Sequence, residues 1–312
     1  MNKILVLLFT IFIITKSKNE IDFLSYHQKF IEVEELIANE NFKDAETKLE
    51  SLLVKYKPSF TKDYIIFSQL CLLNQNKSKA ISWIEESMKF GAKLNCLKEI
   101  ELLNKNFTEN EWKKLETNII ELDSIYRSKI NFSLGARLNR NYQKEQDSKA
   151  EKNYKNVVYS NFKKIKELTD KGTFPGEYLI GIDNVKYASD IPECEFGNSK
   201  VIVTLLHYDF PIIELTEEVL VLAIKKGQLH PREFASIFTL EKNRVSKLYG
   251  SSYKTKKELP DYNFMFAFEM RKNRIDKVNE DRYTFGICSV ETDKKKIEIE
   301  KKYGMKLNFG YK

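Results

Sequence analysis

Apolar residues recur at helical spacing between residues 30 and 90, and this pattern constrains the fold more than any other feature of the sequence. It divides into four segments, each expected to form a helix. Residues that end helices or form turns lie between and after the segments, at Asn39-Glu40-Asn41, Pro58, Asn74-Gln75-Asn76 and Gly91. We therefore expect two successive helical hairpins.

Two small residues mark a repeat within these hairpins. Ala45 and Ala80 each stand near the start of a second helix, and they lie 35 residues apart. The spacing resembles the tetratricopeptide repeat, whose period is about 34 residues and whose small residues let paired helices approach closely. We expect a tetratricopeptide-like helical region over residues 21–125, with a plain helical bundle as the alternative. The resemblance implies a protein or peptide partner on the concave face.

The first residues have the layout of a secretory signal. Met1-Asn2-Lys3 carries a positive charge, the run from Ile4 to Ile14 is apolar apart from Thr10, and Thr15 and Ser17 suit a cleavage site. An eleven-residue helix covers only about 16 Å of a hydrocarbon core of roughly 30 Å. We expect a signal peptide at residues 1–17 and a periplasmic or extracellular protein. An uncleaved membrane tether and a buried N-terminal helix or strand are the alternatives, and no later segment suits membrane spanning.

Composition indicates a folded chain and argues against nucleic-acid binding. Hydrophobic residues make up 42% of the sequence and aromatic residues 12%, which is typical of globular proteins. Of the net charge of +7, the range 251–312 holds the largest share, with 15 Lys/Arg and 10 Asp/Glu. These charges alternate in sign, so we interpret them as a solvated surface.

The four cysteines, Cys71, Cys96, Cys194 and Cys288, lack the close spacing of a zinc or redox site. We expect ordinary buried thiols. The alternative is a disulfide between Cys71 and Cys96, which lie in the same helical region and would be exported to an oxidising compartment.

The second half of the chain begins after a strongly polar stretch. Residues 126–155 read as an exposed helical linker, and residues 156–312 as an α-rich domain. Tyr283-Thr284-Phe285 and Lys306-Leu307-Asn308-Phe309 alternate enough to suggest a small C-terminal β element. The predicted fold class is mainly α, with the second domain an α-rich α+β unit.

Several short marks make residues 140–312 similar to a bacterial domain family of unknown function, often secreted and often placed behind helical repeats. The marks are Phe174-Pro175-Gly176-Glu177 with Gly181, Leu205-x-His207-x-Asp209, Lys226-Gly227 with Pro231, Tyr249-Gly250, and Val278-Asn279-Glu280-Asp281-Arg282 with Gly286. The resemblance implies no established activity.

The sequence departs from this pattern after Ala235. The family carries an Asp-Arg pair there and a Gln just before the Tyr-Gly. This chain instead reads Phe238-Thr239-Leu240-Glu241-Lys242-Asn243-Arg244, and Lys247 stands near the place of the glutamine. A diverged site and a site that was never catalytic are both compatible with the change.

The best candidates for chemistry are His207, Asp209 and Arg282. A histidine beside a carboxylate can act as a general base or a metal ligand, and an arginine can bind an anionic group. The structural alternative is that His207 and Asp209 cap the helix near Thr216 or satisfy buried polar groups.

The remaining histidines give no further site. We expect His230, which precedes Pro231, to be a surface turn residue, and His27 has no partner nearby in sequence. The common hydrolase and nucleotide-binding motifs are missing, so no cofactor or metal is expected. The sequence thus favours an exported protein- or peptide-binding module, with a secreted hydrolase around His207 and Asp209 as the alternative and a cell-surface structural protein as a third possibility.

Overall fold

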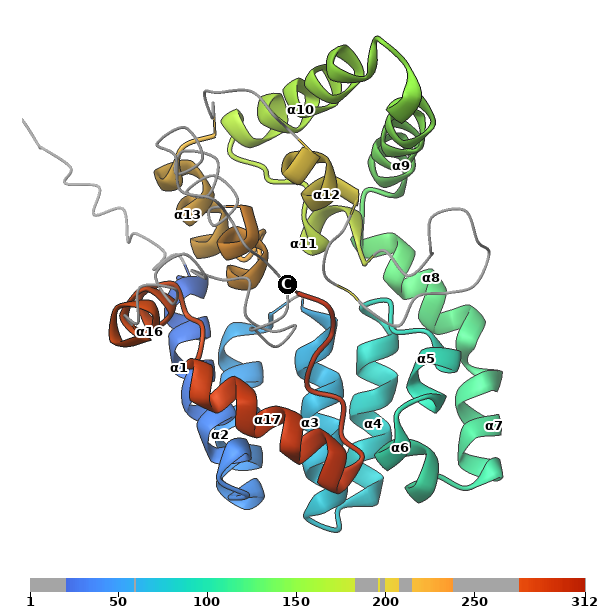
Figure 1. The fold of residues 1–312 in the computed structure, drawn as a ribbon. Helices are drawn as coiled ribbons and strands as arrows, with labels where there is room; N and C mark the ends of the chain where they lie inside the picture. The colour runs from blue at the N-terminus through green and yellow to red at the C-terminus, as the bar shows by residue number, and fades with distance from the viewer. Residues whose placement is uncertain are drawn as a thin grey trace, which may run out of the picture.

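A computed structural model describes residues 21–58, 60–182, 196, 200–207, 215–237 and 275–311. Within these ranges every regular element is a helix (Figure 1), which confirms the mainly α prediction. The predicted signal peptide and Asp209 lie outside the described residues.

The first four helices match the four predicted segments. They are α1 (Phe23–Ala38), α2 (Phe42–Tyr56), α3 (Thr61–Leu73) and α4 (Lys77–Met88). Ala45 and Ala80 are completely buried, as close packing within each pair of helices requires.

The turns inside the two pairs have the same hydrogen bonds, displaced by 35 residues. In the first turn, backbone N–H groups of residues 39, 40 and 41 donate to carbonyls of residues 35, 37 and 36. In the second, residues 74, 75 and 76 donate to residues 70, 72 and 71. The middle residues Glu40 and Gln75 both have left-handed backbones, with φ of 61° and 63°. The 35-residue period is therefore a structural repeat, while its assignment to the tetratricopeptide family stays a prediction.

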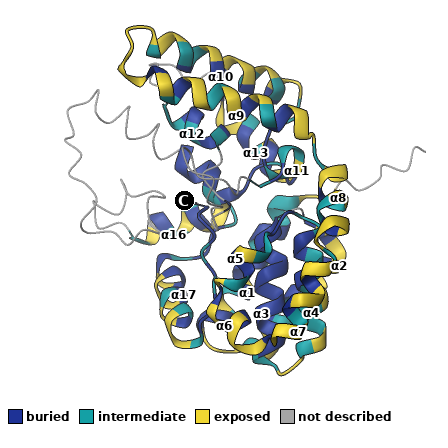
Figure 2. Cartoon of the chain, turned by 90° about the vertical axis from the view of Figure 1, so that its right-hand side faces the viewer, coloured by how far each residue is buried: buried dark blue, intermediate teal, exposed yellow. Residues whose placement is uncertain are grey.

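Helix α3 is the central helix of the first core and, apart from its last residue, is buried on all sides (Figure 2). Its polar residues Thr61, Lys62, Asp63, Ser68 and Gln69 are buried together with its apolar ones. Each of them has a hydrogen-bond partner, as buried polar groups require. A helix that is buried all round cannot show the one-sided apolar stripe of a surface helix.

Four shorter helices extend the first core. They are α5 (Leu94–Lys98), α6 (Glu101–Asn106), α7 (Glu109–Thr117) and α8 (Ile119–Lys129). Apolar side chains of these helices are buried in the first core, among them Leu97, Leu103, Trp112 and Leu115, whereas Ile119 is partly exposed.

A second core lies beyond α8, at the top of Figure 1. Its helices are α9 (Phe132–Asp147), α10 (Tyr154–Asp170), α11 (Glu177–Ile180), α12 (Lys200–His207), α13 (Glu217–Lys225) and a helix over 231–237, with the 3₁₀ turn Ser148–Ala150 between α9 and α10. Leu134 and Leu138 of α9 are buried in this core with Phe162. The stretch 126–155 is therefore helical as expected, but it is not an isolated exposed linker.

The chain then returns to the first core. Helix α16 (Ile275–Thr284) leads to α17 (Val290–Tyr303), which packs across α1. Beyond it, Met305, Leu307, Phe309 and Tyr311 are all buried in the first core. The end of the expected second domain thus completes the N-terminal helices.

The small C-terminal β element is not formed among the described residues. Tyr283 and Thr284 end α16, and the range 304–308 has no regular secondary structure. The alternating apolar residues predicted as a strand instead insert between helices, because every second side chain of an extended segment points the same way.

Candidate functional site

His207, at the end of α12, is paired with a buried carboxylate. Its Nδ1 lies 2.7 Å from Oε1 of Glu145 on α9, while Nδ2 of Asn161 donates to the other carboxylate oxygen at 3.0 Å. Glu145 is fully buried and His207 is partly exposed. Its other expected partner, Asp209, lies outside the described residues, so the predicted His207–Asp209 pair stays a prediction.

Arg282 is not available to a ligand from solvent. It is fully buried on α16, where its Nε donates to the carbonyl of Cys288 at 2.7 Å and its Nη2 pairs with Asp293. Its role as an anion-binding residue beside His207 is unsupported, because these partners already hold the guanidinium.

His230 and His27 are also different from what the sequence suggested. His230 is buried, not a surface turn residue, and its ring lies 5.3 Å from that of His27 and 4.1 Å from that of Tyr311. Burial lowers the pKa of both histidines well below the usual value, so both rings are neutral near pH 7. No local sequence signal identifies this pair, because its members lie some 200 residues apart.

The densest group of charges in the described structure lies beside these rings. It consists of Glu34 on α1, Arg232, Arg282 on α16, and Asp293 and Lys296 on α17, and we call it the ion cluster. Asp293 accepts from Arg232 at 2.7 and 2.9 Å and lies 2.9 Å from Lys296, which also pairs with Glu34 at 2.6 Å. Burial alone raises the pKa of Asp293, but its three cationic neighbours hold that pKa well below the usual value.

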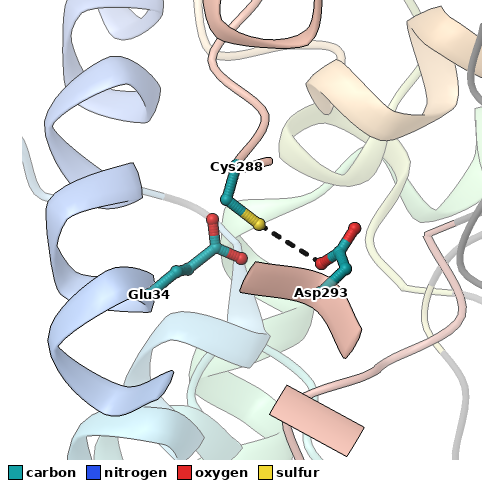
Figure 3. A group of neighbouring side chains, drawn as sticks. All are labelled: Glu34, Cys288 and Asp293. Carbon is teal, nitrogen blue, oxygen red and sulfur yellow. Dashed lines mark hydrogen bonds between the residues drawn. The ribbon is translucent and has the colours of Figure 1, made fainter. Parts of the chain in front are cut away.

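Three members of this region have the spacing of metal ligands (Figure 3). They are Glu34, Cys288 and Asp293, which lie within 4.8 Å of one another. A divalent cation does not fit them, because the surrounding cations already neutralise both carboxylates. Burial also raises the pKa of the Cys288 thiol, whereas a metal ligand must be a thiolate. These three residues therefore give no reason to expect a bound metal ion.

The oxidation states of the three described cysteines match neither prediction completely. Cys71 and Cys288 are buried free thiols, as expected for ordinary core cysteines. Cys96 is disulfide-bonded, and its partner is not Cys71. The Cys71–Cys96 alternative is therefore wrong, and so is the interpretation of Cys96 as a free thiol.

The Phe-Pro-Gly-Glu mark has a structural role. A Cβ at Gly176 would lie 1.9 Å from the carbonyl oxygen of Gln228, so only glycine fits. The next residue, Glu177, accepts hydrogen bonds from the backbone N–H and the hydroxyl of Thr61, both at 2.7 Å. Thr61 is the first residue of α3, so this carboxyl group caps the N-terminus of the central helix from a distant part of the chain.

An apolar groove opens between the end of α4, α5 and the start of α8. Its volume is about 560 Å³, and its apolar lining is Met88, Ala92, Leu94, Ile119 and Leu122. We call it the α4–α8 groove. Two ion pairs link its sides, Lys93 with Asp123 at 2.9 Å and Lys98 with Glu116 at 2.5 Å.

Comparison with known proteins gives no relative for this chain, since no family model, curated protein or solved structure matches it. The two resemblances drawn from the sequence therefore stay predictions. Among the described helices none has the length and apolar character needed to cross a membrane.

Proposed function

We propose that this chain is an exported protein that binds an apolar segment of a protein or peptide partner in the α4–α8 groove. The observation that carries the proposal is the groove itself. Its volume is within the range of about 300–1,000 Å³ typical of ligand sites, and its lining is mostly apolar.

Exposed apolar side chains beside the groove favour a protein or peptide as its ligand. Ile119 is partly exposed, and its neighbour Ile120 is 85% exposed, the most of any large apolar side chain described. An apolar floor with adjacent exposed isoleucines and flanking charges suits a segment that presents two or three apolar anchors, as helix-in-groove recognition does. The charges that flank the groove are paired with each other, so they do not demand a charged ligand.

Two further observations agree with this function. The repeated turns at Glu40 and Gln75 match the construction of helical repeats, which generally present extended binding surfaces. A disulfide at Cys96 agrees with export, because such bonds persist in oxidising compartments.

Site-specific cross-linking tests the proposal. A photoreactive amino acid at Ile120 should capture a partner segment in the source cells, while the same group at Val54, which is 63% exposed on α2, should not. The captured segment is then made as a peptide. We expect I119D to weaken its binding more than tenfold and V54D less than twofold. Equal capture at both positions, or unchanged binding to I119D, would contradict the proposal.

A second candidate function rests on the His207–Glu145 pair. A buried carboxylate at Nδ1 orients an imidazole as it does in hydrolases that use histidine as a general base, and 2.7 Å is a suitable distance. Hydrolysis of ester, peptide and glycoside substrates by the wild-type chain, lost in H207N and kept in I119D, would favour a hydrolase. Lack of turnover by the wild type argues against it.

A further inference from the structure

One wall of the α4–α8 groove is a helix with little stability of its own. On this side the groove is lined by Lys93 and by Leu94, Asn95 and Lys98 of α5. Helix α5 has only five residues, and its N-terminus has no side-chain cap. Helices this short are not stable in isolation, so contacts with the rest of the chain must hold this wall in place.

The ion pairs on the groove side of α5 hold the wall only weakly. Lys93 pairs with Asp123 of α8, and Lys98 pairs with Glu116 of α7, but all four side chains are partly exposed. Surface ion pairs contribute little to stability and are screened by salt. These pairs can align the wall with α7 and α8, but they do not fix it.

The other side of α5 is held within the first core. Leu97 is 1% exposed and Cys96 is 5% exposed, and neither lines the groove. Cys96 is disulfide-bonded. A covalent bond constrains the position of this wall more strongly than exposed ion pairs can.

The cysteine inventory identifies the other half of this bond. The sequence has four cysteines, and Cys71 and Cys288 are free thiols. Cys194, which lies outside the described residues, is therefore left as the partner of Cys96 within the chain.

A described neighbour of Cys194 supports this pairing. Phe196, two residues later, is buried in the first core, where its N–H donates to the carbonyl of Phe309 at 2.6 Å. Leu97, next to Cys96, is buried in the same core. The bond thus joins two segments that contribute to one core and lie 98 residues apart in sequence.

We propose that the disulfide between Cys96 and Cys194 completes the α4–α8 groove, so that the chain binds its partner only after oxidation. This inference rests on the proposed function and adds the control of binding by the redox state of the compartment. In a reducing compartment both residues are thiols, and Leu97 and two exposed ion pairs hold α5 without the covalent bond. The wall then moves more freely, and the groove loses its shape.

The oxidation is a thiol–disulfide exchange with a disulfide oxidant. One cysteine thiolate attacks a sulfur of the oxidant, whose S–S bond breaks, and a mixed disulfide forms. The second thiolate attacks the cysteine sulfur of that mixed disulfide, which forms the bond within the chain and releases the oxidant as a dithiol. Two electrons and two protons pass from the chain to the oxidant in total. Disulfides form in oxidising compartments, so binding begins once the chain has been exported.

Hydrogen exchange of the full chain tests the structural step without any partner. Reduction by dithiothreitol should speed exchange of the α5 amides by about tenfold or more and leave those of α2, which does not line the groove, unchanged. C96S and C194S should show the fast α5 exchange without reductant, whereas C71S, which removes a free thiol, should respond like the wild type. Equal α5 exchange before and after reduction, or slow α5 exchange in C194S, would overturn the proposal.

The photoreactive amino acid at position 120 tests the functional step. In the source cells, the chain with all four cysteines and the C71S variant should capture a partner, and C96S and C194S should capture about tenfold less at equal amounts of folded protein. Equal capture by C96S would overturn redox control while leaving the groove as the binding site. No capture by the chain with all four cysteines would refute the proposed function, and redox control of binding with it, so the two failures are distinguishable.

Discussion

The side-chain amide of Gln69 bonds both backbone polar groups of Lys306, 237 residues later in the chain. Its Nε2 donates to the Lys306 carbonyl at 2.9 Å, and its Oε1 accepts from the Lys306 N–H at 2.7 Å. A glutamine on the central helix thus takes the place of a neighbouring strand. It fixes the C-terminal segment in the first core.

We expect Q69A to destabilise the protein by about 1–3 kcal/mol, because the partly buried N–H and carbonyl groups of Lys306 lose these two hydrogen bonds. Urea unfolding measures the change in free energy. The exposed Gln143 provides the control, and Q143A should change stability by less than about 0.5 kcal/mol. Similar values for the two variants would mean that the C-terminal segment does not depend on this pair.

Two buried carboxyl groups should make stability fall as pH rises from about 4.5 to about 8. Burial raises the pKa of Glu177 to about 7 and that of Glu233 to about 8. Both values lie above the unfolded pKa of 4.5, so the contribution is fully present below pH 4.5, falls as pH rises, and is gone once pH exceeds about 7 for Glu177 and about 8 for Glu233. The loss is on the order of a few kcal/mol.

The variant E233Q tests this origin, because a glutamine does not ionise. Its unfolding free energy should change less between about pH 6.5 and 8 than that of the wild type. His27 and His230, whose pKa values are lowered, contribute a constant amount above pH 6.5 and lose it only as pH falls below that value. An unchanged slope in E233Q would assign the effect to other groups.

Buried and exposed ion pairs should differ sharply in their response to substitution. D293N removes the carboxylate that Arg232, Arg282 and Lys296 share, and we expect a loss of about 3–5 kcal/mol because three buried cations lose their main partner. D123N breaks pairs with the exposed side chains of Lys93 and Arg127. That variant should lose less than about 1 kcal/mol, and a comparable loss in both would contradict the role of the ion cluster.

The G176A variant tests whether the Phe-Pro-Gly-Glu mark is structural. A methyl group 1.9 Å from the Gln228 carbonyl oxygen forces the backbone apart, so a loss of about 1–3 kcal/mol or more is expected. Its thermal unfolding can be compared with that of S82A, an exposed helical position where we expect little change. If G176A is as stable as S82A, the tight contact is absent in solution.

The N-terminal helices could be predicted from the sequence, but the contacts that join them to the later parts of the chain could not. Apolar spacing located α1 to α4, and the turn residues predicted their ends, because both signals are local. Lys62 and His230 carry no such signal. A lysine near the start of a helix and a histidine before a proline ordinarily face solvent, and only contacts from the far end of the chain bury them.

The candidate sites could also be predicted only as far as their residues are close in sequence. His207 was identified because a histidine with a nearby carboxylate is a recognisable pattern, yet its partner in the described structure is Glu145, 62 residues earlier. Arg282 was identified from a resemblance, and its function here is to pair with Asp293. The α4–α8 groove has no sequence signature, since isolated isoleucines are common on protein surfaces.

The insertion of residues 305–311 into the first core has a kinetic consequence. The N-terminal hairpins leave the ribosome early, but the apolar side chains that complete their core are synthesised more than 200 residues later. Contacts of such high sequence separation form slowly. Until residues 305–311 have been synthesised, the first core stays incomplete, and the apolar surface that these residues cover is exposed.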